Sequence, residues 1–185
     1  MLFSLFSSLL GSAILSNVIL QGVGLEAVLD RQIRVKPVLI KSTLISVLAL
    51  VVFLIYYVLL KLVLVPLDMA YLSIIVLALL MIGVNELYNL VVNKTKFNLP
   101  KDELFGLHSI IIIVGFFGLS TQAFDVAFVS VLGSLIGFIA LSVLLTMIQS
   151  RMRVNPLIKA FKGLPILLII LGLIALVLNG LGGLF

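Results

Sequence analysis

The sequence contains no cysteine and only one histidine, His108. The missing thiols exclude disulfides, thiolate nucleophiles and every metal or iron–sulfur site with cysteine ligands. A single histidine likewise excludes a metal site built from several histidines of this chain. No phosphate-binding loop, nucleotide fingerprint or catalytic Ser/His/Asp set is present either. We therefore expect no catalytic residues, and no metal or cofactor bound by this chain alone.

Charge is scarce as well. Of 185 residues, 10% are charged and 63% are hydrophobic, and the mean hydropathy is +1.42. A soluble domain is about 25% charged and about 45–50% apolar. The composition excludes a soluble enzyme, a nucleic-acid-binding domain and a disordered chain, and it predicts an integral membrane protein surrounded by the lipid bilayer. The amino terminus lacks the basic region of a cleaved signal peptide, so its first apolar stretch is expected to be a retained membrane segment.

Charge-poor runs predict six transmembrane helices, because about 20 apolar residues cross a hydrocarbon core of about 30 Å. The runs cover residues 2–25, 42–60, 69–92, 104–124, 126–150 and 163–185. None of them alternates apolar and polar residues as a membrane β-strand does. We expect one all-α membrane domain over residues 1–185, with a hydrophilic loop at about residues 93–103 separating residues 1–92 from residues 104–185.

The basic residues follow the first, third and fifth runs. They are Arg31, Arg34, Lys36, Lys41, Lys94, Lys96, Lys101, Arg151, Arg153, Lys159 and Lys162. Lys61 alone lies near the opposite face, whose loops carry Asp68 and Asp125. By the positive-inside rule, the three basic loops are cytoplasmic and both termini face outward.

The two halves look related, since each contains three runs and begins with a glycine-interrupted one. The glycines lie in Gly22-Val23-Gly24 and in Gly115-Phe116-Phe117-Gly118. Three crossings per half give the halves opposite orientations, which defines an inverted repeat. Broken helices at matching positions point to a site near the membrane midplane, so we predict that the first and fourth helices are broken. Alternatively, these glycines let helices pack closely, as we expect for Gly133-x-x-x-Gly137.

Several segments resemble one known family. The strongest likeness lies in Leu64-Val65-Pro66-Leu67-Asp68-Met69-Ala70-Tyr71-Leu72 and in Val91-Val92-Asn93-Lys94-Thr95. Further matches are Gly133, Gly137-Phe138, Arg151, Phe161-Lys162-Gly163, Gly172-Leu173 and Gly180-Leu181-Gly182-Gly183-Leu184. In order and spacing these segments resemble the Rnf/Nqr family of membrane subunits, and within it the RnfA/NqrE type. The resemblance covers essentially the whole chain.

The resemblance implies a six-helix subunit with inverted repeats and outward termini in the bacterial plasma (inner) membrane. It also implies a homologous RnfE/NqrD-type partner and further subunits, in a complex that couples electron transfer to Na⁺ or H⁺ movement. In that family the broken helices supply cysteines to an iron–sulfur cluster. The corresponding positions here carry Glu26 and Phe116. Phenylalanine cannot ligate iron and glutamate is a poor substitute for a thiolate, so flavin and iron–sulfur groups are expected only in partner subunits.

Some polar residues lie within or beside the predicted spans. These candidate site residues are Asn17, Gln21, Glu26, Asn85, Glu86, Asn89 and His108. An ionisable residue inside a span is costly and often functional. One interpretation is that Glu86 handles a cation or a proton. The other is that it reaches the membrane interface near Lys94, and the shallow depth of Glu86 in the span favours this second interpretation. Glu26 either lines a midplane cavity or begins the cytoplasmic loop.

The remaining candidates have simpler explanations. Asn17 and Gln21 share one helix face, as do Asn85 and Asn89, and such amides mostly bond neighbouring helices. His108 begins the fourth span, where a lone histidine is more often interfacial than part of a proton relay.

Two functional hypotheses follow, and a purely structural assembly subunit is a third. The first is a membrane subunit of an Rnf/Nqr-like ion-translocating electron-transport complex, without an iron–sulfur cluster of its own. The second is an inverted-repeat solute or ion transporter that has lost the redox centre. Broken helices fit both equally, and the family resemblance favours the first.

Overall fold

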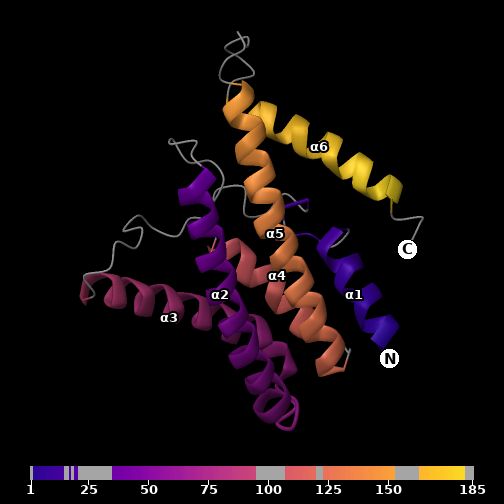
Figure 1. Ribbon diagram of the computed structural model, residues 1–185. Coiled ribbons are helices and arrows are strands. Elements are labelled where there is room, and N and C mark those ends of the chain that lie inside the picture. Colours follow the sequence, from indigo (N-terminus) through magenta and orange to yellow (C-terminus); the bar gives the residue numbers. More distant parts are fainter. Residues whose placement is uncertain are drawn as a thin grey trace.

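The computed structural model describes residues 2–14, 17, 19–20, 35–94, 107–119, 123–152 and 163–181. Nearly all of these residues are helical, and none of them lies in a β-strand. In chain order the α-helices are α1 (Leu2–Ile14), α2 (Val35–Leu59), α3 (Ser73–Lys94), α4 (Leu107–Leu119), α5 (Phe124–Met152) and α6 (Leu164–Leu181) (Figure 1). The prediction of an all-α protein is confirmed over these ranges.

Three stretches are long and apolar enough to cross a membrane. They are Val35–Leu64, Ala70–Leu90 and Phe124–Met152. At about 1.5 Å per residue, the first and last are roughly 45 and 43 Å long, more than a core of about 30 Å requires. The second, third and fifth predicted runs are thus confirmed as long apolar helices. However, α2 begins at Val35 rather than at residue 42, so Lys36 and Lys41 belong to its first two turns.

Two further helices, α1 and α4, are described over 13 residues each. The residues directly before and after these two ranges lie outside the described part of the chain. The predicted break at Gly115–Gly118 is wrong, because α4 is helical through all four residues. The break predicted at Gly22–Gly24 lies outside the described residues.

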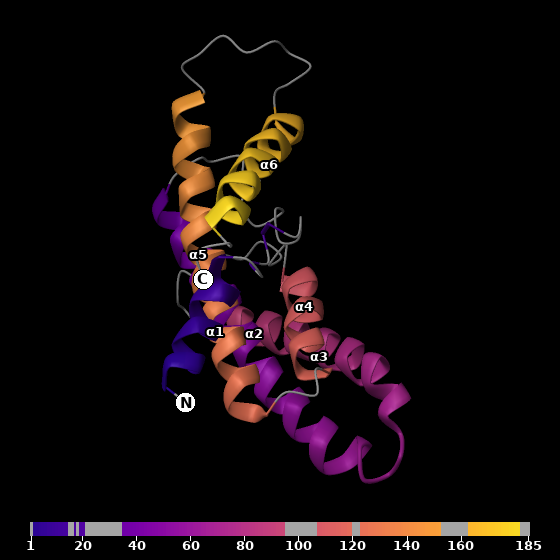
Figure 2. The same cartoon turned by 90° about the vertical axis from the view of Figure 1, so that its right-hand side faces the viewer.

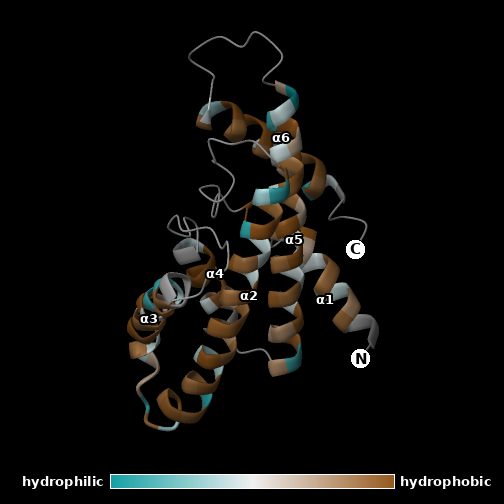
Figure 3. Cartoon of the chain, turned by 60° about the vertical axis from the view of Figure 1, so that its left-hand side comes forward, coloured by the Kyte–Doolittle hydropathy of each residue, from teal (hydrophilic) through white to brown (hydrophobic). Residues whose placement is uncertain are grey.

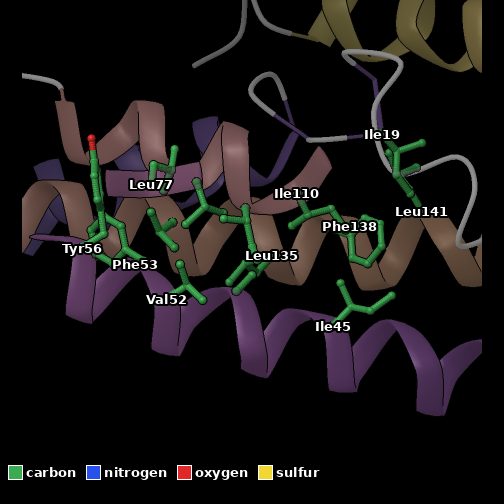
Figure 4. Packing of buried hydrophobic residues seen from close by; sticks show 14 of the residues in the cluster. Ile19, Ile45, Val52, Phe53, Tyr56, Leu77, Ile110, Leu135, Phe138 and Leu141 are labelled. Atoms are coloured by element: carbon green, nitrogen blue, oxygen red, sulfur yellow. The ribbon is translucent and has the colours of Figure 1, made fainter. Parts of the chain in front are cut away.

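The centre of the fold is an antiparallel pair formed by α2 and α5. The two helices pack on each other, side by side in Figure 1 and crossing at an angle in Figure 2. Near one end, the Tyr57 ring of α2 lies 5.0 Å from the Phe124 ring of α5. Further along, Ile45 lies below Phe138 (Figure 4). Because lipid is as apolar as these side chains, their close packing rather than their removal from water stabilises the pair in a bilayer.

The α1 and α4 helices each pack on a different member of this pair. The α1 helix packs mainly against α5, and α4 packs mainly against α2. The α3 and α6 helices extend away from the pair at steep angles (Figures 1 and 2). Their apolar faces remain largely exposed, with only 17% of the α3 window buried against 56% of the α5 window.

Polar residues concentrate at the two ends of the central pair (Figure 3). Because α2 and α5 are antiparallel, Lys36 at the start of α2 and Arg151 at the end of α5 lie at one end. Asp125 in the first turn of α5 and Lys61 near the end of α2 lie at the other. The charges of α5 also match its helix dipole, with an acid in the first turn and a base in the last.

The α2 helix continues into a π-helical turn, Leu60–Leu64, and the left-handed residue Asp68 follows four residues later. Asp68 has φ 59°, Met69 N–H donates to the Leu64 carbonyl at 2.9 Å, and Asp68 N–H donates to the Val65 carbonyl at 3.2 Å. This is the Schellman arrangement, which pairs the free carbonyls of a helix end with backbone donors. It turns the chain sharply toward the 3-10 turn Ala70–Leu72 and α3.

The packing of α1 on α5 predicts a specific disulfide. The Ser8 and Ser130 hydroxyls are 2.9 Å apart, so the paired variant Ser8→Cys/Ser130→Cys should form a cross-link almost completely under mild oxidation. No native thiol interferes, because the chain lacks cysteine. Loss of maleimide reactivity and of two hydrogens from the intact mass would report the bond. Ser150 lies about 30 Å from Ser130 along α5, so the control pair Ser8→Cys/Ser150→Cys should keep both thiols. Equal cross-linking of the two pairs would contradict the packing of Ser8 beside Ser130.

Candidate functional site

Small residues on α5 allow α1 to approach it closely. A Cβ atom at Gly133 would overlap the Ser12 hydroxyl and the Leu9 carbonyl. A Cβ atom at Gly137 would overlap the Ala13 carbonyl and the Asn17 amide. Residue numbers increase together on the two helices, so α1 and α5 run parallel. The predicted packing role of Gly133 and Gly137 is therefore confirmed, and the neighbour is the first helix.

The first helix ends in the protein interior at Asn17. Asn17 is non-helical and 0% exposed. Its Nδ2 donates to the Ala13 carbonyl at 2.9 Å, and its Oδ1 accepts from Ile19 N–H at 3.0 Å. The Asn17 side chain thus satisfies the Ala13 carbonyl and the Ile19 N–H. An apolar interior requires such partners, because buried backbone groups must be hydrogen-bonded. Ile19 in turn lies beside Leu141 of α5 (Figure 4).

Three of the four buried hydroxyl groups of α5 are paired within that helix, and the fourth, on Ser130, is paired with the Ser8 hydroxyl of α1. Ser134 donates to the Val131 carbonyl at 2.9 Å, Ser142 to the Ile139 carbonyl at 2.8 Å and Thr146 to the Ser142 carbonyl at 2.7 Å. Such bonds satisfy the hydroxyl without a partner helix or water. The hydroxyl donors of Ser134, Ser142 and Thr146 are therefore used within α5, and one N–H of the Asn17 amide is used at the Ala13 carbonyl.

Phe116 lies on the outer side of α4. It is 60% exposed and lines a groove of about 150 Å³ between α3 and α4, together with Ile74, Leu77, Ala78, Met81 and Ile112. The adjacent Gly115 packs directly on Leu77, which explains why glycine is used there without a break in the helix. All six lining side chains are apolar, so this groove offers nothing to coordinate a metal ion.

The polar residues of α3 lie away from the helix centre. Glu86 is exposed and shares its face with Ile82 and Leu90, four residues before and after it, while Asn85 and Asn89 are half-buried. Glu86 lies four residues from the end of the apolar stretch Ala70–Leu90, or about 6 Å. At that depth the Glu86 carboxylate can extend to the membrane surface. The side chain is exposed rather than buried in the central pair.

The other candidates are only partly visible. Gln21 and Glu26 lie outside the described residues, and His108 is the second residue of α4, with its side chain outside the described part. Asn17 is thus the one candidate with a defined role, and it is not brought together with Asn85, Glu86 or Asn89. Among the described residues, no group of three His, Asp or Glu side chains is placed to hold a metal ion.

One unpaired buried group was not expected from the sequence. Tyr56 is 0% exposed, and its Oη has no partner in hydrogen-bonding geometry, although the buried Ser73 lies beside it. A tyrosine within an apolar run gives no sign of where its hydroxyl points. It packs with Phe53 and Leu77 where α2, α3 and α4 meet (Figure 4).

Replacing Tyr56 by phenylalanine should stabilise the protein. An unpaired buried hydroxyl costs about 1–3 kcal/mol, and phenylalanine keeps the ring that fills the site. We expect the thermal midpoint of Tyr56→Phe in detergent to rise by about 2–4 °C, measured by circular dichroism. Tyr71→Phe, at a residue that is 74% exposed, should change nothing. A lower midpoint for Tyr56→Phe would instead reveal a bound partner for the hydroxyl.

Comparisons with known proteins add no assignment. No family model matches the sequence, and no curated protein matches it significantly.

Proposed function

We propose that the protein is a membrane subunit of an Rnf/Nqr-like ion-translocating electron-transport complex, and that its six helices form two inverted repeats. In this role it packs against a homologous subunit and shapes the membrane part of the complex. It holds no iron–sulfur cluster itself. Electrons pass through flavin and iron–sulfur groups of the partner subunits.

The observation that carries the proposal is the pairing of helices around α2 and α5. If α1 is exchanged with α4 and α2 with α5, the α1–α5 contact becomes the α4–α2 contact, which is also present. The α2–α5 contact is unchanged by this exchange. Each of α1 and α4 also runs in the same direction as the long helix it packs on (Figures 1 and 2). An inverted repeat accounts for these relations.

The charge distribution supports the orientation that this topology requires. Lys36 and Arg151 lie at one end of the central pair, and Asp68 and Asp125 at the other. The positive-inside rule then places the end with Lys36 and Arg151 in the cytoplasm. In that orientation α1 and α5 run inward, whereas α2 and α4 run outward.

The packing of the centre favours a subunit over a self-sufficient transporter. A transported solute or ion needs polar groups that face a water-filled path. In the described part of the chain, the buried hydroxyl groups of α5 bond within that helix or to Ser8 of α1, and the α3–α4 groove is apolar. An ion path shared with a partner subunit does not need such groups within this chain.

The proposal is tested by isolating the tagged chain from its native membrane in a mild detergent, with everything that remains bound. We expect flavoprotein and iron–sulfur subunits to co-purify, with flavin and iron present in fixed ratio to the chain. The variant Gly137→Leu, which we expect to disrupt the α1–α5 contact, should lose these partners, and Gly172→Leu should keep them. A colourless single species with solute or ion transport activity in vesicles would overturn the proposal in favour of the transporter.

A further inference from the structure

A groove of about 400 Å³ lies at the end of α5 that carries Arg151. Its described lining residues are Met147, Ile148, Ser150 and Arg151. The lining changes character along the helix: Met147 and Ile148 are apolar, and Ser150 and Arg151, nearly a turn further on, are polar. An amphipathic lining of this kind fits a molecule with an anionic head and an apolar tail.

The length of α5 places this groove at the level of lipid headgroups. Asp125 and Arg151 lie 26 positions apart in one continuous helix, which is about 39 Å at 1.5 Å per residue. A bilayer is about 30 Å thick in its hydrocarbon core and about 40–45 Å with its headgroup regions. When Asp125 is at one surface, Arg151 therefore reaches the headgroups of the other leaflet, and Met147 lies about 6 Å deeper, beside the first methylenes of an acyl chain.

The electrostatics of this end select an anion. Lys36 of α2 lies at the same end as Arg151. Between residues 150 and 163 the sequence has four basic residues and no acidic one. The Ser150 hydroxyl already donates to the Met147 carbonyl at 2.7 Å. The donor that remains in the described lining is the Arg151 guanidinium, which can bind two phosphate oxygens at once.

We propose that this groove binds one anionic phospholipid, with its headgroup phosphate on Arg151 and the start of an acyl chain along Met147 and Ile148. A phospholipid uses both halves of the lining, whereas free phosphate gains nothing from Met147 or Ile148. Basic residues just outside a membrane span attract anionic lipids in general, and the groove adds a defined position. The inference requires only that α5 crosses a membrane, and it does not depend on the role in electron transport.

The test uses the purified full-length chain, stripped of lipid in detergent. Phosphatidylglycerol or phosphatidylcholine with the same acyl chains is added, and the bound lipid is counted by native mass spectrometry. We expect one tightly bound phosphatidylglycerol and much weaker binding of phosphatidylcholine. Arg151→Gln should weaken phosphatidylglycerol binding about tenfold, the effect of losing a hydrogen bond to a charged group. Arg151→Lys should be intermediate, because an ammonium cannot form the bidentate pair.

Lys36→Gln is the matched control, since it removes one positive charge from the same end but outside the groove. It should weaken binding by less than about twofold, as expected for an exposed charge. Equal losses for Lys36→Gln and Arg151→Gln would overturn the proposal in favour of diffuse attraction. Equal binding of the two lipids, or displacement of phosphatidylglycerol by millimolar inorganic phosphate, would overturn it as well. If Arg151→Gln does not fold, Met147→Asp tests the apolar half, and unchanged lipid binding in that variant would also contradict the site.

Discussion

Gly137→Leu should break the contact between α1 and α5 and strongly destabilise the protein. Even a Cβ atom at this position overlaps the Ala13 carbonyl and the Asn17 amide. The obstacle is backbone and a hydrogen-bonded side chain rather than the flexible end of a residue, so α1 must move away. Overpacking of a filled interior costs about 1–3 kcal/mol. Displacing α1 adds the loss of the Ser8–Ser130 hydrogen bond and of the Asn17 bonds.

The measurement is the thermal midpoint by circular dichroism, together with the monodisperse fraction on size-exclusion chromatography. We expect Gly137→Leu to lower the midpoint by at least about 10 °C, on a scale of about 2–4 °C per kcal/mol for a chain of this size. Gly172→Leu on α6 is the matched control, because nothing lies within 4 Å of a Cβ atom there. A Gly137→Leu protein as stable as Gly172→Leu would mean that α1 does not pack on α5 as described.

Asn17→Ala is the second substitution with a large expected effect. It leaves the Ala13 carbonyl and the Ile19 N–H without their partners in a fully buried position. Each unpaired buried backbone group costs about 1–3 kcal/mol, so we expect a loss of about 2–5 kcal/mol in the free energy of unfolding. Unfolding by a denaturing detergent, followed by circular dichroism, would measure it.

Two further variants separate the hydrogen bonds from the volume of the side chain. Asn17→Asp keeps an acceptor for Ile19 N–H but loses the donor to Ala13 and buries a charge, so it should be at least as destabilising as Asn17→Ala. Asn179→Ala, at an exposed position of α6, should be neutral. If Asn17→Ala were equally neutral, water would have to reach the end of α1, and the centre would not be apolar.

The long helices could be predicted from the sequence because they depend on composition alone. The charge-poor stretches that form α2, α3 and α5 are mostly apolar, and only a helix satisfies the backbone in such surroundings. The sequence predicts too late a start for α2, because Lys36 and Lys41 interrupt the apolar run. Long lysine side chains can extend along a helix toward water, so a membrane helix tolerates them near its end.

The site depended on contacts that no single stretch of sequence contains. The glycines predict breaks in helices, yet Gly115 serves close packing on Leu77, and the buried non-helical residue described after α1 is Asn17. An amide four residues after Ala13 is an ordinary helical spacing. The role of Asn17 at the end of α1 depends on its close contact with Gly137 of α5, which is far away in the sequence. Likewise, the exposure of Phe116 is set by where α3 lies, which depends on the turn at Asp68.

The length of the central pair has a consequence for the surrounding bilayer. The apolar helices Val35–Leu64 and Phe124–Met152 are more than 40 Å long, whereas a hydrocarbon core is about 30 Å thick. A helix longer than the core is accommodated by tilting, so hydrophobic mismatch should tilt the pair. Lipids with longer acyl chains should therefore reduce this tilt.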